Sequence, residues 1–242
     1  MGLSFSFMQF IPEIQLAIHD VTDGIPEYID EYLNVYGELL PQYVRYIPVM
    51  RQRAEKPHDE SSNEKWHQWL LRVRDHPAGM IEFIYNRRHN TGLLLDFGIK
   101  PEARYVNYRE YKNLAGLVLH IAMQKLIQDS REHGYVAPLC MITEVEYPRL
   151  VEKYAEYGFV EFPIEYFEPP FTPELSALSE MEIFDKIGYK KMHLGAFQIP
   201  GYEFDPGNSS VIKETLLALL EDHYGLPVNH WLMQRMFQEI RE

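Results

Sequence analysis

Apolar and polar positions in the first fifty residues follow two different periods. Residues 15–21 (QLAIHDV) form a short β-like run, which the Asp23-Gly24 turn closes. Over residues 26–50, apolar residues recur at the three- and four-residue spacing of a helix. Pro41 lies inside this region and is expected to divide it into two helices, because proline interrupts the helical hydrogen-bond ladder.

Shorter runs in the next fifty residues predict a β meander. Residues 51–65 are polar and predict a loop, with a closing helical turn as an alternative. Residues 66–73, 80–85 and 93–99 form three β-like runs separated by turn-forming residues. Because such short connections join antiparallel neighbours, we expect an antiparallel meander.

Helical spacing returns after Pro101. A long amphipathic helix is predicted over residues 111–126 and is expected to end near Gly134, since glycine often terminates helices. A buried strand follows at residues 139–145, and a second helix is predicted over residues 148–157. The order strand, long helix, strand implies a right-handed crossover and therefore one parallel pair.

The last third of the chain mixes short strands and helices. Strands are predicted at residues 159–167 and 191–197, with a helical insertion at residues 172–187 between them. Two C-terminal helices are predicted at residues 209–224 and 231–237. Ser209 or Ser210 is expected to cap the first C-terminal helix. We expect one domain over residues 1–199, including the insertion, and a helical appendage over residues 200–242 packed on it.

Composition and charge narrow the class of protein. The chain is 46% hydrophobic and 24% charged, as globular proteins are, and its net charge is −13. Such an acidic surface repels phosphate backbones, so we expect no nucleic-acid partner. The lone Cys140 excludes an intrachain disulfide and suits a reducing compartment. Since no apolar run reaches membrane-spanning length, we expect a cytoplasmic protein without a membrane partner.

Two segments carry a resemblance to a known family. Ile99–Arg104 (IKPEAR) is similar to V-x-P-x-x-R, and Tyr147–Glu161 (YPRLVEKYAEYGFVE) is similar to N-P-R-A-x-x-L-Y-E-K-L-G-F-x-E. Both patterns are typical of the GNAT acyl-CoA N-acyltransferases. The order of predicted strands and helices agrees over residues 15–197, so in these respects the chain resembles that family.

The resemblance implies a fold and a cosubstrate. The fold would be mixed α/β (α+β): a mostly antiparallel central sheet of about seven strands with one splayed parallel pair and flanking helices, followed by the C-terminal helices. The cosubstrate would be acetyl-CoA or another acyl-CoA, with its pantetheine arm along the splayed strands and its pyrophosphate at the start of the long helix. The cofactor-binding residues would be Phe97, Gly98, Ile99, Arg104, Arg109, Lys112, Ala115, Gly116 and Tyr147.

The phosphate-binding segment departs from the family pattern. The motif R-x-x-G-x-G would follow Arg104 almost directly, but residues 105–112 come first. Either the loop is about ten residues longer and still wraps phosphate, or the helix starts near Tyr108 without a glycine. The charges of Arg104, Arg109 and Lys112 could serve a phosphate site or a solvated helix face. Tyr147 replaces the asparagine often found at its position.

Transfer of an acyl group to an amine needs a base and gains from an acid. Tyr154 matches the family's thiolate-protonating tyrosine, and packing between helix and sheet is the alternative. Candidate bases are the carboxylates of Asp96, Glu144, Glu146 and Glu82, and a water chain could also serve. The histidines and Cys140 form no compact metal-ligand pattern, so we expect no metal site.

Two functions remain open from the sequence. The first is N-acyl transfer to a small-molecule or peptide amine, with acetyl as the expected acyl group. The second is a non-catalytic GNAT-like module that binds a ligand or a protein with a modified CoA cleft. The C-terminal helices could cover the protein's own core or seal a homodimer.

Overall fold

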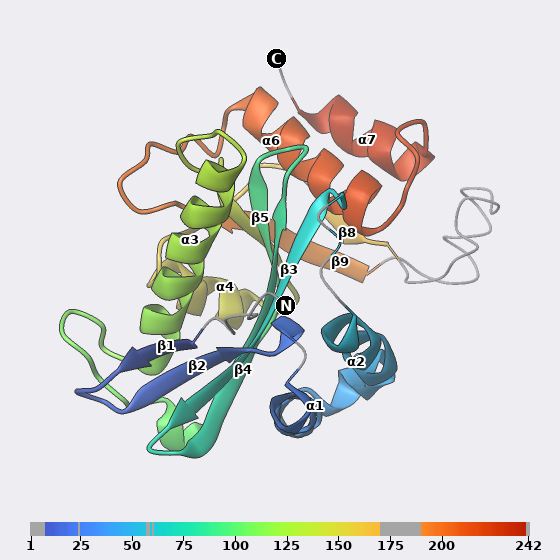
Figure 1. The fold of residues 1–242 in the computed structure, drawn as a ribbon. Helices are drawn as coiled ribbons and strands as arrows, with labels where there is room; N and C mark the ends of the chain where they lie inside the picture. Colours follow the sequence, from blue (N-terminus) through green and yellow to red (C-terminus); the bar gives the residue numbers. More distant parts are fainter. Residues whose placement is uncertain (1–7, 24, 57–58, 60, 170–189, 241–242) are drawn as a thin grey trace. The chain divides into compact units, whose positions relative to one another are not determined.

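A computed structural model describes residues 8–23, 25–56, 59, 61–169 and 190–240 of the chain (Figure 1). It shows a mixed α/β fold built on a nine-stranded sheet in the order β1-β2-β3-β4-β5-β6-β9-β7, with β8 paired to β9. The expected fold class is confirmed, with more strands than the expected seven. The helical insertion predicted at residues 172–187 lies outside the described residues.

The chain divides into two compact units. The first comprises the chain up to Ile84 together with Leu94–Gln124, and the second comprises Tyr85–Leu93 together with the chain from Lys125 onward. Strands β4 (His76–Asn86) and β5 (Thr91–Ile99) and helix α3 (Leu114–Glu132) run through both units.

The first unit begins with a strand that the sequence pattern missed. β1 (Met8–Ile11) pairs antiparallel with β2 (Leu16–Asp20), and β2 pairs antiparallel with β3 (Glu64–Val73). β1 has only four residues, too few for an alternating pattern to be recognised. The β meander predicted over three β-like runs is present as β3, β4 and β5, adjacent in the sheet.

Two helices of the first unit form its helical layer. α1 (Pro26–Leu39) buries Ile29, Tyr32, Leu33 and Tyr36, the stripe that its spacing predicted. A 3₁₀ segment (Pro41–Tyr46) then separates α1 from α2 (Ile47–Glu55), so the division at Pro41 is confirmed. The loop predicted from residue 51 is wrong at its start, because α2 continues to Glu55 and buries Ala54 in the core with α1.

The second unit centres on β9 (Lys190–Phe197). β9 pairs antiparallel with β6 (Met141–Val145), with β7 (Phe159–Glu161) and with β8 (Tyr166–Glu168). The single strand predicted at residues 159–167 is therefore two short ones. β5 and β6 run parallel in register Gly92–Met141 and Leu93–Ile142, as the crossover rule predicted.

Four helical segments complete the second unit. α4 (Pro148–Ala155) starts with a proline in its first turn, and Gly158 beyond its end has φ +87°, a conformation that favours glycine. α6 (Ser209–Leu216) runs into a π-helix, η5 (Leu217–His223), and α7 (Trp231–Glu239) follows. The cap of α6 is Asn208 rather than a serine, because its side chain accepts from the N–H groups of Ser210 and Val211. Among the described helices, none is both long and apolar enough to cross a bilayer.

Candidate active site

The Asp96 carboxyl lies on β5 in the first unit, beside another carboxyl. Tyr36 on α1 donates its hydroxyl to Asp96 Oδ2 at 3.3 Å. Burial, followed by the charge of Glu82, raises the pKa of Asp96 to about 7, and the Tyr36 hydrogen bond opposes this only in part. The carboxyl is therefore able to exchange a proton near neutral pH.

Glu82 on β4 is buried and paired with a cation. Arg53 donates to its Oε1 at 2.9 Å and Gln68 donates to the same oxygen at 3.0 Å. The Arg53 guanidinium also lies 3.2 Å from the centre of the Trp66 ring. With a cation and an amide already on it, Glu82 serves as the charged neighbour of Asp96 rather than as a free base.

A buried tyrosine completes this group. Within the described residues, the Tyr32 hydroxyl has no hydrogen-bond partner, although its side chain is fully buried. Burial and the charges of Glu82 and Asp96 raise the pKa of Tyr32 well above its usual value. Tyr32 thus remains a neutral donor close to both carboxyls.

Glu144 on β6 lies in the second unit and is held by two tyrosines. Tyr224, just after η5, donates its hydroxyl to Oε2 at 2.7 Å, and Tyr166 on β8 donates a short hydrogen bond to Oε1. Burial raises the pKa of Glu144 to about 7, against the lowering effect of the two tyrosines. The C-terminal helices therefore supply a direct contact to a predicted catalytic residue. The fourth candidate base, Glu146, is paired with Lys190 at 2.6 Å.

Tyr154 on α4 lies in an aromatic cluster of the second unit. Its ring centre is 5.3 Å from that of Phe197 and 6.1 Å from that of Phe159. Phe159 and Phe197 are paired in register and so share one face of the sheet. Glu144 pairs with Leu194, whose side chain alternates to the other face from Phe197. The sheet of the second unit thus separates Tyr154 from Glu144.

Part of the predicted cofactor segment has a packing reason for its sequence. A Cβ on Gly98 would lie 2.9 Å from Leu39 Cδ1, so the α1 packing requires a small residue there. Ile99 is buried, and its carbonyl accepts from Arg104 Nε at 3.1 Å. Phe97 is half-buried. Arg104 therefore ties down the end of β5 as well as carrying a charge.

The loop between Arg104 and α3 is longer than in the family pattern. α3 begins at Leu114, so the alternative of a helix start near Tyr108 is wrong. Within the loop, Tyr108 and Tyr111 form an isolated antiparallel bridge, with Arg109 at φ +51° and its guanidinium 4.9 Å from the Tyr108 ring centre. Lys112 is exposed. Two of the predicted cations are therefore carried on a tight turn before the helix.

Asn113 caps this helix. Asn113 Oδ1 accepts from the N–H of Gly116 at 2.9 Å. One of the N–H groups expected to face a phosphate is thereby already bonded within the protein. Ala115 is half-buried at the same helix start, and Tyr147, before α4, is exposed. The S/T/D/N signal for a cap was present in the sequence at Asn113.

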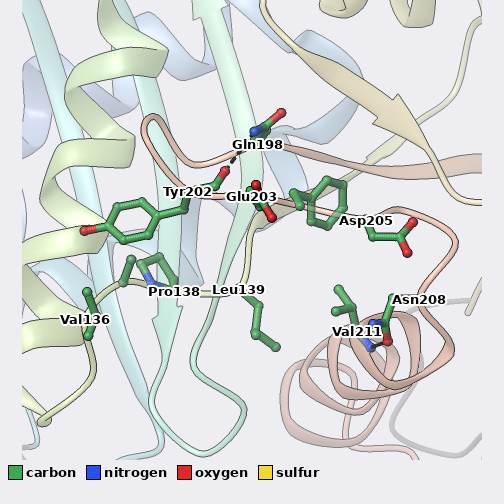
Figure 2. A pocket seen from close by; sticks show the side chains of 11 residues that line it. Val136, Pro138, Leu139, Gln198, Tyr202, Glu203, Asp205, Asn208 and Val211 are labelled. Atoms are coloured by element: carbon green, nitrogen blue, oxygen red, sulfur yellow. Dashed lines mark hydrogen bonds between the residues drawn. The ribbon is translucent and has the colours of Figure 1, made fainter.

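Two hollows lie in the second unit. Figure 2 shows the larger, of about 600 Å³, between Pro138 and Leu139 on one side and the Gln198–Asp205 segment on the other, with Asn208 and Val211 below. The smaller, of about 560 Å³, lies along the edge of the sheet. It is lined by nine residues: Glu161, Phe162, Pro163, Ile164, Glu165, Tyr166, Lys191, Met192 and His193. Over the described residues, the larger lining contains none of the predicted site residues, whereas the smaller contains the tyrosine that binds Glu144.

Comparisons with solved structures bear on the fold. A chimera of the spermidine N-acetyltransferase SpeG from Vibrio cholerae and hSSAT superposes with a TM-score of 0.50 at 17% identity, covering 76% of this chain and 95% of that one. A protein described as an acetyltransferase superposes with a TM-score of 0.50 at 12% identity, covering 93% and 100%. The chain has the GNAT fold. No protein-family model matches the sequence, and no curated protein matches it.

Each of the two ionisable carboxyls lies on a strand of its own unit. Asp96 lies on β5 in the first unit, and Glu144 lies on β6 in the second unit. The sequence pointed to both carboxyls but not to Tyr36, Tyr166 or Tyr224, which hold them. Those partners come from distant segments, and only the fold brings them to the strands.

Proposed function

We propose that the protein is an acyl-CoA-dependent N-acyltransferase, with acetyl as the simplest acyl group. The observation that carries the proposal is the Asp96 carboxyl on β5, whose pKa of about 7 suits a base that works near neutral pH. The GNAT fold supports the reaction class by analogy. The amine nitrogen would form a bond to the thioester carbon as the carbon–sulfur bond breaks, and Asp96 would take the proton that the nitrogen loses.

Asp96 is a better base than Glu144 on hydrogen-bonding grounds. Both oxygens of Glu144 accept tyrosine hydroxyls, which fix the side chain and occupy its lone pairs. Asp96 receives a single, longer hydrogen bond from Tyr36. Removing a proton from an amine therefore costs fewer existing interactions at Asp96, and Glu144 stands second.

Tyr154 is the proposed acid. A phenol can give its proton to the departing thiolate, because the two groups have comparable pKa values. The contacts of its ring with Phe159 and Phe197 restrict the ring, which would hold the hydroxyl in one place. The same contacts would exist if the tyrosine only packed, so the phenylalanine variant has to distinguish the roles.

The residues proposed to hold the CoA phosphates offer charge rather than amides. Arg109 and Lys112 are exposed in the long loop, and Arg104 keeps further guanidinium donors beyond its bond to Ile99. They fit a polyphosphate as point charges, whereas the Gly116 N–H is already bonded to Asn113. Phe97, Gly98 and Ile99 would pair with the pantetheine arm, and Ala115 and Tyr147 would border it. CoA, when bound, supplies the activated thioester.

The proposed acceptor is a small-molecule or peptide amine. A protein of net charge −13 attracts a cationic amine over long range. The hollow along β8 and β9 contains Glu161 and Glu165 and includes Tyr166, which contacts Glu144. Because one structural neighbour is named for spermidine, polyamines are the first acceptors to test.

The test follows CoA release by mass spectrometry from acetyl-CoA with spermidine, an aminoglycoside and a lysine peptide. Asp96→Asn is expected to lower kcat by about 10²–10⁴-fold and to remove the rise of kcat/KM with pH near 7. Tyr154→Phe is expected to lower kcat with CoA binding unchanged. Equal turnover in both variants and the wild-type protein would rule out these roles.

One observation favours the non-catalytic alternative. The Asn113 cap satisfies an amide that a phosphate would otherwise bind, so the cofactor site could be weakened. Binding of CoA decides the matter before any turnover is sought: CoA and acetyl-CoA should raise the melting temperature at millimolar concentration. If neither ligand does so, the enzyme hypothesis fails and the modified cleft becomes the better account.

A further inference from the structure

A histidine and two carboxylates meet in the second unit, away from Asp96 and Glu144. His89 lies in the turn between β4 and β5, and Glu221 and Asp222 lie in the π-helix η5. One potential ligand atom from each residue lies within 4.8 Å of the other two. In a tetrahedral zinc site neighbouring ligand atoms are about 3.3 Å apart, so small side-chain movements would close this set around an ion.

The imidazole of His89 is oriented for coordination. Its Nδ1 lies 2.7 Å from Glu214 Oε2, which places a ring proton on Nδ1, so that in the neutral imidazole the lone pair is on Nε2. A carboxylate on the outer nitrogen of a metal-binding histidine is a common supporting contact. The His89 side chain is only 5% exposed, so this arrangement is built into the interior.

Two polar atoms of the cluster have no hydrogen-bond partner. Within the described residues, His89 Nε2 and Glu221 Oε2 are buried without a hydrogen bond. His89 Nε2 lies 3.6 Å from Asp222 Oδ2, too far for a hydrogen bond. Two carboxylate oxygens and an imidazole lone pair that lie within 4.8 Å of one another repel, unless a cation lies between them.

The net charge of the side chains around the site is negative, which favours a divalent cation. Arg88 Nη1 lies 3.2 Å from Glu221 Oε1 and 3.2 Å from Asp222 Oδ1, so it binds one oxygen of each carboxylate. Asn86 donates to Asp222 Oδ2 at 2.9 Å and orients it. The carboxylates of Glu214, Glu221 and Asp222 and the guanidinium of Arg88 give a formal charge of about −2 around His89.

We propose that His89, Glu221 and Asp222 bind a divalent transition-metal ion of the zinc type. An imidazole with two carboxylates suits such ions, whereas magnesium and calcium prefer oxygen ligands alone. Glu214 is a positioning residue that acts through His89. The ion links the β4–β5 turn to η5, and both segments belong to the second unit. Water completes its coordination.

The test is a titration of the chelator-treated full chain with Zn²⁺, and with Co²⁺ for its visible absorption. We expect one tight site per chain and a rise of roughly 5–10 °C in melting temperature at about 100 times the dissociation constant. Mg²⁺ and Ca²⁺ should give no comparable rise. Glu221→Gln, which keeps the side-chain shape, should weaken Zn²⁺ binding at least tenfold, and Glu214→Gln should weaken it by about 10–100-fold.

A matched control separates this site from surface binding. His193 Nδ1 lies 2.7 Å from Glu161 Oε1, the same distance as in the His89–Glu214 pair, but it is on the surface. His193→Gln should leave the tight site unchanged, while His89→Gln should remove it. If the His89→Gln variant does not fold, the Zn²⁺ affinity of the Glu221→Gln variant decides whether the site exists. Zn²⁺ binding that is absent, or that survives Glu221→Gln and His89→Gln undiminished, overturns the proposal.

Discussion

At the scale of single residues, the charge of the Asp96 carboxyl depends on pH within the neutral range. Its pKa is raised from 3.8 to about 7 by burial and by Glu82. A carboxyl whose folded pKa lies above its unfolded value binds more protons when folded, so stability falls as pH rises from about 4 to 7. Above pH 7 the folded protein carries an anion that the unfolded chain would solvate better.

Asp96→Asn removes this ionisation and should stabilise the protein at alkaline pH. We expect the free energy of unfolding to rise by roughly 1–3 kcal/mol at pH 8 and to change little at pH 4. Urea denaturation at the two pH values measures the difference. Asp75→Asn, at an exposed turn, is the control and should change neither value. Equal stability of wild type and Asp96→Asn at pH 8 would show that Asp96 ionises normally.

At the scale of secondary-structure elements, the start of α3 rests on one capping side chain. Asn113 is bonded to the Gly116 N–H, and its loss leaves that amide unsatisfied at the helix end. Asn113→Ala should lower the free energy of unfolding by about 1 kcal/mol. Asn107→Ala, an exposed substitution in the same loop, should have little effect.

The same pair of variants examines the phosphate site. If the proposed CoA site includes the start of α3, freeing the Gly116 N–H should leave CoA affinity equal or improve it, even as stability falls. Calorimetric titration with CoA gives the affinity of each variant. A marked loss of affinity in Asn113→Ala alone would instead make Asn113 itself a cofactor ligand.

The C-terminal helices contribute through Tyr224, which follows η5. Its hydroxyl bonds the Glu144 carboxyl, and hydrogen bonds to a charged group contribute more than neutral ones. Tyr224→Phe should therefore cost about 1–3 kcal/mol at pH 8, where Glu144 is ionised, and less at pH 5. Thermal melts at both pH values report this, with the exposed Tyr105→Phe as the control. A loss that is the same at both pH values would mean that the Glu144 charge is not involved.

At the scale of the whole molecule, several buried groups act on stability in opposite directions. Asp96 and Glu144 have raised pKa values, so both lower stability as pH rises to about 7. Burial acts to raise the pKa of Asp20, but the hydrogen bonds that it accepts from His67 and Trp69, with the charge of His67, outweigh burial and lower the pKa below its usual value. The contribution of Asp20 to stability is therefore lost as pH falls below about 4. His19, whose pKa burial lowers, acts in the same direction as Asp20.

These shifts predict a stability maximum on the acidic side of neutrality. The two raised carboxyls outweigh His19, so the melting temperature should be higher near pH 5–6 than at pH 8. Melts in buffers of constant ionic strength, at one-unit intervals from pH 4 to pH 9, would show it. In the double variant Asp96→Asn/Glu144→Gln, the melting temperature should change little between pH 6 and pH 9. A melting temperature that still falls steeply over this range would assign the effect to the net charge of −13 instead.

The sequence was informative where periodicity extends over many residues. The spacing of Ile29, Tyr32, Leu33 and Tyr36 predicted α1 and its buried face, and Pro41 predicted its end. Short or context-dependent features were missed, such as β1 and the continuation of α2 to Glu55. In those segments contacts with other elements, rather than local preference, decide the structure.

The candidate site shows the same limit more sharply. Asp96 and Glu144 could be named from their strands, but their pKa values depend on partners that are far along the chain. Tyr224 is 80 residues from Glu144, and Glu214 is 125 residues from His89. Compact motifs cannot reveal such pairs. The spacing of residues along the sequence therefore did not indicate the group formed by His89, Glu221 and Asp222.

The buried Cys140 gives the folded chain an internal reporter of its own motions. Burial raises the pKa of its thiol to about 12, and the cysteine adjoins the parallel pair, where its carbonyl accepts from the Gly92 N–H and the Thr91 hydroxyl. The thiolate that reacts with labelling reagents is therefore almost absent until this part of the sheet opens. Because the chain has a single cysteine, the labelling rate of the unmodified protein measures how often β5 and β6 separate.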